Sequence, residues 1–353
     1  MRAKIVWGLI IVLIYFLSLT ASEAKLISEK CDVCHTMHNS QDGVEMTYNT
    51  GLNPSLLRND CIGCHTGTNI TGSFPFVLDT EQTPVYGTTG TDGESNTLAG
   101  GNFYWCVSND SMGHNVVGAT TDEDQTLHLT PPGGTALGAR LACAGRYGCH
   151  GDRSKSDQFT AMKMSHHYTK PQLWQDGSTI AKSYRFLDGI QGFGHTTYEY
   201  RPSRTSHNKY YGKDRSFETD NAAGTISSLC SQCHGDFHNG SGNVAPGSFS
   251  GGVWFRHPTD FDMGSSTGSE FDFYNGGSGE FNPYSVISPV ATANTGATVN
   301  QTVYTSSNDA IVMCLSCHRP HGTPYSSLLR WNYKAWPGVE GYNGCAICHT
   351  EKD

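Results

Sequence analysis

The chain has 353 residues with a formal net charge of −9, and it is rich in glycine (41 residues), histidine (16) and cysteine (13). It contains no basic tract, so its composition gives no support for a nucleic-acid partner and we expect none. Apolar residues show neither a sustained helical period nor a sustained alternation, which argues against a core of long helices or regular sheets.

The N-terminal segment has the pattern of a secretory signal. Basic residues in the first four positions precede an apolar run from Ile5 to Leu19, and the small-residue pattern Ser22-Glu23-Ala24 follows. This pattern predicts a signal peptide over residues 1–24. A membrane anchor is the alternative, but the apolar run has about 15 residues and a spanning helix needs roughly 20. We therefore expect an exported protein, soluble or peripheral, whose mature chain is residues 25–353.

Along the mature chain, a pair of cysteines followed at once by a histidine occurs six times. Five copies have the strict spacing Cys-x-x-Cys-His, and the third is stretched from Cys143 to Cys149-His150. Disulfide frameworks and zinc sites also use paired cysteines, but neither needs an adjacent histidine. Two thiols three positions apart reach both vinyl groups of one porphyrin and the next imidazole points at its iron, so the repeat predicts six covalently attached c-type haems. The attachment residues are Cys31, Cys34, Cys61, Cys64, Cys143, Cys149, Cys230, Cys233, Cys314, Cys317, Cys345 and Cys348.

The spread of the motifs predicts the fold. The mature chain offers roughly 55 residues for each haem, too few for a conventional core around each one. The haems must therefore supply much of the core, and we expect one continuous domain over residues 25–353. The expected fold is an irregular, haem-packed multihaem cytochrome c, mostly coil with short helices and little strand. Short helical turns are predicted at Asn53–Cys64, Asp157–His167, Thr225–His234 and Asp309–His318.

The number of histidines decides whether any iron keeps an open coordination position. The six motif histidines are the proximal ligands, and ten others remain, so every iron can have two imidazole ligands. Irons closed in this way transfer electrons and do not readily bind substrate. Two of the ten, His128 and His195, have little local support and are interpreted as surface or hydrogen-bonding residues. The proximal ligands are His35, His65, His150, His234, His318 and His349; the candidate distal ligands are His38, His114, His166, His167, His207, His238, His257 and His321.

Three candidate distal ligands, His38, His238 and His321, follow a motif within three or four residues. A histidine this close cannot reach the opposite face of its own haem, because the porphyrin lies between them, but it can reach a neighbouring haem. Such residues would place successive haems side by side in a stack. Exposure to solvent is the alternative for each. In the tandem pair His166-His167, adjacent helical residues face about 100° apart, so at most one of them ligates a given haem.

One cysteine, Cys106, lies outside the motifs, between Trp105 and Val107. We interpret it as a small buried apolar residue, because unpaired cysteines are among the most buried side chains. An intersubunit disulfide is the alternative.

Several segments accompany the motifs in a recognisable order: Cys31-Asp32-Val33-Cys34-His35-Thr36-Met37-His38, Gly113-His114-Asn115-Val116-Val117, Pro131-Pro132-Gly133-Gly134, Cys233-His234-Gly235-Asp236-Phe237-His238, Arg256-His257-Pro258 and Cys314-Leu315-Ser316-Cys317-His318-Arg319-Pro320-His321. Over essentially the whole mature chain, they resemble the hexahaem extracellular cytochromes of metal-reducing bacteria, the OmcS-type nanowire cytochromes. The resemblance implies bis-histidine haems in a continuous stack and polymerisation into a filament. It also implies that His38 ligates a haem of the adjoining subunit, the fifth in order.

The chain departs from this family at the third motif. Gly151-Asp152-Arg153 follow without the nearby histidine that family members can carry there. We therefore expect His166 or His167 to supply the distal ligand of the third haem. Either Gly145-Arg146-Tyr147 loops out and both thiols bond the porphyrin, or a single thioether holds it.

The combination of export and saturated irons predicts an electron-transfer protein and not an enzyme. The resemblance adds the role of a subunit in a conductive extracellular filament. The expected partners are copies of the chain itself, outer-membrane cytochrome donors, and mineral, cell or soluble electron acceptors. Two alternatives remain: a soluble monomeric periplasmic carrier, and a multihaem reductase with one open haem site.

Overall fold

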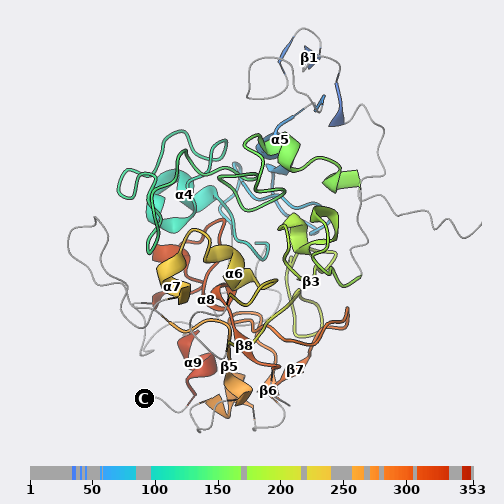
Figure 1. Cartoon of the computed structure of the whole chain (residues 1–353), viewed down its shortest axis with the longest axis vertical. Coiled ribbons are helices and arrows are strands. Elements are labelled where there is room, and N and C mark those ends of the chain that lie inside the picture. The colour runs from blue at the N-terminus through green and yellow to red at the C-terminus, as the bar shows by residue number, and fades with distance from the viewer. Residues whose placement is uncertain are drawn as a thin grey trace, which may run out of the picture.

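The chain follows an irregular path in which short helices and two-residue strands are joined by long stretches of turn and coil (Figure 1). The computed structural model describes residues 34–36, 56–57, 59–84, 97–167, 173–215, 221–239, 257–265, 271–277, 282–304, 308–333 and 344–350, and the backbone of 40–41 and 44–45. The expected fold class, mostly coil with short helices and little strand, is confirmed. The α-helices are α3 (Cys61–His65), α4 (Tyr104–Ser108), α5 (Gln158–Ala161), α6 (Ile226–Cys230), α7 (Gly235–Asn239), α8 (Cys314–Cys317) and α9 (Cys345–Cys348).

In the described part of the chain the strands form four antiparallel pairs, and each strand has only two residues. The pairs are β1 (Ser40–Gln41) with β2 (Val44–Glu45), β3 (Gly192–Phe193) with β4 (Lys209–Tyr210), β5 (Phe261–Asp262) with β8 (Ile311–Val312), and β6 (Asn282–Pro283) with β7 (Thr302–Val303). Single turns of 3₁₀ helix lie at Asp110–Met112, Ser165–His167, Ile180–Lys182, Tyr184–Phe186, Met263–Ser265, Tyr274–Gly276 and Ser326–Leu328.

Two of the predicted helices begin where the sequence places them. The Thr225 side chain caps α6 by accepting a hydrogen bond from Ser228 N–H, and Asp157 caps α5 by accepting one from Thr160 N–H. The helix expected to continue from Asp157 to residue 167 nevertheless ends at Ala161. The chain turns through Met164, whose φ of 69° is incompatible with a right-handed helix.

The other two predicted helices are shorter than expected. In the segment Asp309–His318 only α8 is helical, because Ile311 and Val312 are β-branched and pair with β5 instead. In the segment Asn53–Cys64 the helix begins at Cys61, where the Asp60 carboxylate accepts a hydrogen bond from Gly63 N–H at 2.6 Å. Residues 53–55 lie outside the described part of the chain. In both segments the predicted helix was longer than the observed one.

Three small apolar clusters hold the chain together. The first surrounds the fully buried Ile311, the second surrounds the fully buried Tyr274, and the third contains Phe103. Cys106 of α4 is 1% exposed, as expected for a buried apolar residue. The motif cysteines that pack against the three clusters are, in the same order, Cys230, Cys348 and Cys143. Each cluster thus positions at least one attachment motif.

The elements are stacked along the long axis of the molecule. In Figure 1, α4 and α5 lie in the upper half, α6, α7 and α8 in the middle, and α9 with β6 and β7 at the lower end. Helices α6 and α8 pack together although 83 residues separate the end of one from the start of the other, at Cys230 and Cys314. None of the described helices has the length and apolar character needed to cross a bilayer. The predicted signal segment, residues 1–24, lies outside the described residues.

Candidate functional site

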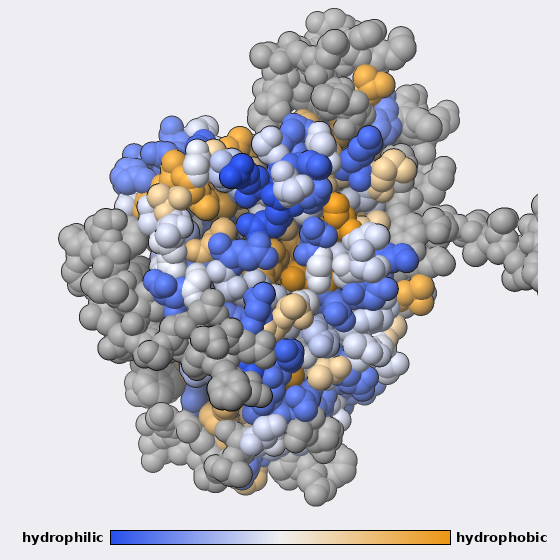
Figure 2. Space-filling model, viewed as in Figure 1, coloured by the Kyte–Doolittle hydropathy of each residue, from blue (hydrophilic) through white to orange (hydrophobic). Residues whose placement is uncertain are grey.

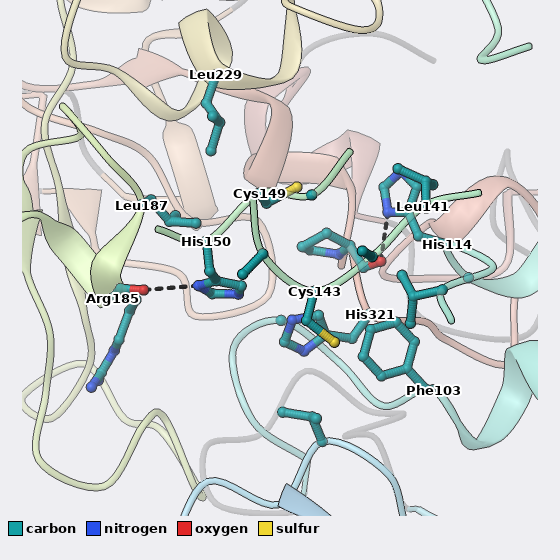
Figure 3. Close-up of a pocket in the computed structure, with 18 of the residues that line it drawn as sticks. Phe103, His114, Leu141, Cys143, Cys149, His150, Arg185, Leu187, Leu229 and His321 are labelled. Atoms are coloured by element: carbon teal, nitrogen blue, oxygen red, sulfur yellow. Dashed lines mark hydrogen bonds between the residues drawn. The ribbon is translucent and has the colours of Figure 1, made fainter. Parts of the chain in front are cut away.

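A large internal cavity runs past five of the six motifs. Its volume is about 2020 Å³, whereas ordinary small-molecule pockets reach only about 1,000 Å³. Apolar side chains such as Leu141, Leu187 and Leu229 line it beside the motif residues (Figure 3), and apolar side chains show between hydrophilic ones at the middle of the face seen in Figure 2. The cavity therefore has the size and the apolar lining for several large flat cofactors.

Histidine rings lie in four pairs, three of which line this cavity, and in the fourth His257 lines it. Each pair joins one motif histidine to one of the predicted distal candidates. The distances between ring centres are 6.3 Å for His65 and His166, 6.4 Å for His150 and His321, 6.1 Å for His234 and His114, and 6.1 Å for His349 and His257.

This spacing fits two imidazoles on opposite sides of one metal ion. A metal–imidazole bond is about 2 Å long and the nitrogen lies about 1 Å from the ring centre, so the two centres should be about 6 Å apart. The rings are too far apart for direct stacking, as the contrast with His207 and Tyr284 at 3.8 Å shows. The donor set of two imidazoles and two adjacent thiols therefore suits a c-type haem.

Five of the paired imidazoles lie in surroundings that favour the neutral form that binds metal ions. Burial lowers the pKa of His65, His150 and His234. Burial, aided by neighbouring histidines, lowers the pKa of His114 to about 4 and that of His321 to about 3. A neutral imidazole offers a nitrogen lone pair, so no proton has to be displaced before ligation.

Backbone carbonyl groups fix the orientation of the motif histidines. The Nδ1 atoms of His65, His150, His234 and His318 lie 3.0, 2.9, 2.7 and 2.8 Å from carbonyl oxygens of other segments. A bond from Nδ1–H to a carbonyl leaves Nε2 as the nitrogen that faces the cavity. Sequence reasoning did not identify these acceptors, because a carbonyl carries no sequence signal. They belong to Pro75, Arg185, Pro132 and Ser327, in the same order.

The thiols of successive motifs lie next to one another in chain order. The hydrogen bond between Cys61 and Cys143 joins the second motif to the third and raises the pKa of Cys143, and the one between Cys230 and Cys314 joins the fourth to the fifth and raises the pKa of Cys230.

At each of the other three junctions, the charge of a thiol in one motif raises the pKa of a thiol in the adjacent motif. Burial is the main cause that raises the pKa of each thiol concerned, and a thiol of the adjacent motif adds to the rise. The pairs are Cys64 with Cys34, Cys149 with Cys233, and Cys317 with Cys348. Among the described cysteines, each motif therefore interacts with the next one along the chain, two pairs through a hydrogen bond and three through their charges.

The stretched third motif keeps the backbone closure of the strict motifs. In three strict copies the histidine N–H donates to the carbonyl of the first cysteine at 2.9–3.0 Å, and His150 N–H donates to the Cys143 carbonyl at 3.0 Å. The extra residues form a side loop that Gly145 begins with a φ of 81° and that closes through Gly145 N–H to the His150 carbonyl. The first cysteine and the histidine consequently have the same backbone connection despite the insertion.

Two predicted distal ligands, His207 and His238, have protein groups against their ring nitrogens. The two ring nitrogens of His207 lie 2.5 Å from the Asn208 carbonyl oxygen and 3.2 Å from that of Asn300. The Nε2 atom of His238 lies 2.9 Å from the buried carboxylate of Asp260. Both side chains are almost fully buried, and the contacts of their ring nitrogens favour a hydrogen-bonding role.

The arrangement at the third motif differs from the expectation that His166 or His167 lies opposite its histidine. His166 lies opposite His65 of the second motif, and His321 occupies the position opposite His150. His321 therefore faces a motif other than its own, as expected from its place three residues after His318. Because pairing joins segments so far apart in sequence, the spacing between motif and histidine could not identify the partner.

The remaining assignments concern the first and fifth motifs. Cys31, His38 and the side chain of His167 lie outside the described part of the structure. Among the described residues, no imidazole ring lies opposite His318. His128 and His195 form hydrogen bonds to Glu123 and to Thr197 and Ser206, in agreement with their interpretation as hydrogen-bonding residues.

Comparison with known proteins adds to this geometry. Residues 308–353, which contain the fifth and sixth motifs, match the family model described as a doubled CXXCH motif. The chain is 27% identical over 355 aligned positions to the C-type cytochrome OmcS of Geobacter sulfurreducens, covering 86% of this chain and 78% of the relative. It also has the fold of two solved structures from that organism, the outer membrane cytochrome S filament (TM-score 0.52, 22% identity) and the OmcS nanowires (TM-score 0.51, 20% identity); both matches cover 88% of this chain and 85% of the other. The chain is therefore an OmcS-like multihaem c-type cytochrome.

Proposed function

We propose that this protein transfers electrons along six bis-histidine c-type haems arranged in one line. The observation that carries the proposal is that thiols of consecutive motifs interact at every junction, two pairs through a hydrogen bond and three through their charges, since each thiol marks the edge of one attached porphyrin. Haem iron with two axial imidazoles supplies one-electron exchange. The protein's own contribution is to hold the motifs in order and to keep water and substrates away from the irons.

Four irons would be ligated by the facing pairs His65 and His166, His150 and His321, His234 and His114, and His349 and His257. For the first motif we propose His167, because His166 already faces the second motif and the first two motifs adjoin at Cys34 and Cys64. Both cysteines of the third motif would bond haem, because the Cys143 to His150 closure matches that of the strict motifs.

For the fifth motif we propose that His38 of the next subunit supplies the distal imidazole. In the part of the chain that the structure describes, His318 is the one cavity-lining motif histidine that is hydrogen-bonded through Nδ1 and yet has no imidazole opposite. A ligand donated by a second copy makes a head-to-tail contact, which generates an open filament when its rotation does not close. The similarity to proteins solved as filaments supports this assembly.

The same arrangement favours a carrier over an enzyme. A multihaem reductase needs an iron with an open position, whereas the four facing pairs close theirs and His38 and His167 would close the other two. We infer an exported protein that acts at the outer cell surface or beyond it. It would accept electrons from outer-membrane cytochromes and pass them to minerals, other cells or soluble acceptors.

Haem content is the first test. The mature holoprotein is expected to carry six haems by intact mass and by pyridine haemochrome absorbance. Replacing Cys149 by alanine should retain six haems, with one held by a single thioether. A wild-type mass with five haems would show that the third motif is not an attachment site.

Filament formation is the second test. His38→Ala is expected to abolish filaments in negative-stain micrographs of the secreted fraction while all six haems stay attached. His128→Ala, which removes a surface histidine, is the matched control and should form normal filaments. Filaments of normal length from the His38 variant would rule out the intersubunit ligand, whereas wild-type protein that forms no filaments would leave the monomeric carrier as the better assignment.

A further inference from the structure

A two-residue turn, Arg185-Phe186, lies between the ligands of the second and third motifs. The Arg185 carbonyl oxygen accepts a hydrogen bond from Nδ1–H of His150 at 2.9 Å, drawn as a dashed line in Figure 3. The Phe186 ring centre lies 5.3 Å from that of His166. One short turn therefore contacts the proximal imidazole of one haem site and the distal imidazole of its neighbour.

The backbone of this turn has an unfavourable conformation. Arg185 and Phe186 have φ values of 49° and 60°, in the left-handed region that L-residues with large side chains rarely adopt. Two such residues in succession persist only where surrounding contacts hold them. Here the Phe186 carbonyl oxygen also accepts a hydrogen bond from Gly151 N–H at 2.8 Å, which ties the turn to the residue after His150.

The Arg185 side chain supplies the contacts that hold the turn. Its guanidinium lies 4.4 Å from the centre of the Tyr198 ring, and Nη2 donates to the His195 carbonyl oxygen and to Asn208 Oδ1, the latter at 3.2 Å. Asn208 is fully buried, and its backbone N–H donates to the Glu199 carboxylate at 2.9 Å. The arginine is thus anchored at its far end in a rigid polar network.

This anchoring has a consequence for the iron site. A carbonyl that accepts the Nδ1 proton makes the imidazole a stronger electron donor, which stabilises ferric iron and lowers the reduction potential. The Phe186 ring restricts rotation of the His166 imidazole about its bond to the chain. The orientation of both imidazoles consequently depends on a turn that would relax without the Arg185 side chain.

We propose that Arg185 and Phe186 are positioning residues that lower the reduction potential of the third haem and fix the distal ring orientation at the second. The proposal rests on the proposed function, because it assigns a role to residues around those haems. The turn also makes the two sites mechanically dependent, since displacement of Arg185 moves Phe186 as well.

The test compares Arg185→Ala with Arg201→Ala in the holoprotein. Arg201 is a matched control, because it also has a positive φ, of 47°, and lies over a tyrosine ring, but it is exposed and its stacking partner is Tyr200. In a spectroelectrochemical titration, Arg185→Ala is expected to shift one of six haems to higher potential and to change the EPR signal of that haem. Arg201→Ala should give the wild-type curve.

Two further variants complete the design. Phe186→Ala is expected to change the EPR signal of a different haem, since it frees the ring of His166. Arg185→Gln keeps the aliphatic stem and a polar end but loses the cation over Tyr198, so it should give a smaller shift in the same direction. It replaces the alanine variant if that variant does not assemble.

The outcomes separate this proposal from the function on which it rests. A variant with six haems, lower thermal stability and an unchanged titration would mean a purely structural role and would overturn the proposal. Fewer than six haems in the wild-type protein would instead overturn the proposed function, because the pyridine haemochrome assay does not depend on Arg185.

Discussion

The pairing of His321 with His150 gives the sharpest test of the ligand assignments. Removing the imidazole of His321 by substitution with alanine should leave one iron with a single axial ligand. The rest of the site should remain, because His150 keeps its bond to the Arg185 carbonyl and the ring of Phe103, 4.8 Å from that of His321, still covers the space. The change is therefore local to one iron.

The magnitude follows from the count of sites. One of six irons loses its second strong ligand, so about one sixth of the total iron should become high-spin in the oxidised protein. Burial holds the pKa of His321 at about 3, so the wild-type ligand is neutral and its removal deletes no charge at neutral pH. The vacated space has the shape of the deleted ring, so added imidazole should restore the low-spin state.

Room-temperature magnetic circular dichroism and low-temperature EPR measure this fraction directly. The matched control is His207→Ala, a buried histidine that stacks on Tyr284 and whose ring nitrogens both face carbonyl oxygens. It should lose about 2–4 kcal/mol of stability through a cavity and unpaired carbonyls, yet keep all six irons low-spin. A fully low-spin spectrum from the His321 variant, with six haems attached, would refute the pairing.

Three further changes test the packing around the cavity. Burial raises the pKa of Tyr184 from 10 to about 12, so its contribution to stability is complete below pH 10 and is lost as the pH rises through 12. In urea unfolding, Tyr184→Phe should reduce the loss of stability over this pH range by about 3 kcal/mol. An unchanged pH profile would contradict the assignment. Gly134→Ala should lower the melting temperature because a Cβ atom would collide with the Cys233 carbonyl, whereas Gly296→Ala, whose Cβ would meet open space, should leave it unchanged. Ile311→Ala should reduce stability in guanidinium unfolding by about 2–5 kcal/mol, since the side chain is fully buried, and a loss well below that range would mean that the cluster around it is loosely packed.

The sequence predicted which motifs and residue types form the site better than it predicted which histidine lies opposite which motif. The five strict motifs and the absence of periodicity were sufficient to predict an irregular haem-packed fold, because both are local properties of the chain. The sequence identified the candidate distal ligands as a group, within which the contacts of His207 and His238 favour hydrogen bonding over ligation. Their environment is set by Asn300 and Asp260, which are remote in sequence, so no local pattern could separate them from true candidates.

The lack of regular structure is itself part of how the ligands are positioned. Inside an α-helix each carbonyl is used by the N–H four residues later, so it is not free to accept a bond from an imidazole. The carbonyls that orient His65, His234 and His114 belong instead to prolines in turns or coil. The carbonyl that contacts His114 belongs to Pro320, which is 206 positions away in the sequence. A chain that must present a separate carbonyl to many buried imidazoles therefore gains more from turns and coil than from long helices. The apolar area that helices would otherwise bury is supplied, on the proposed function, by the porphyrins.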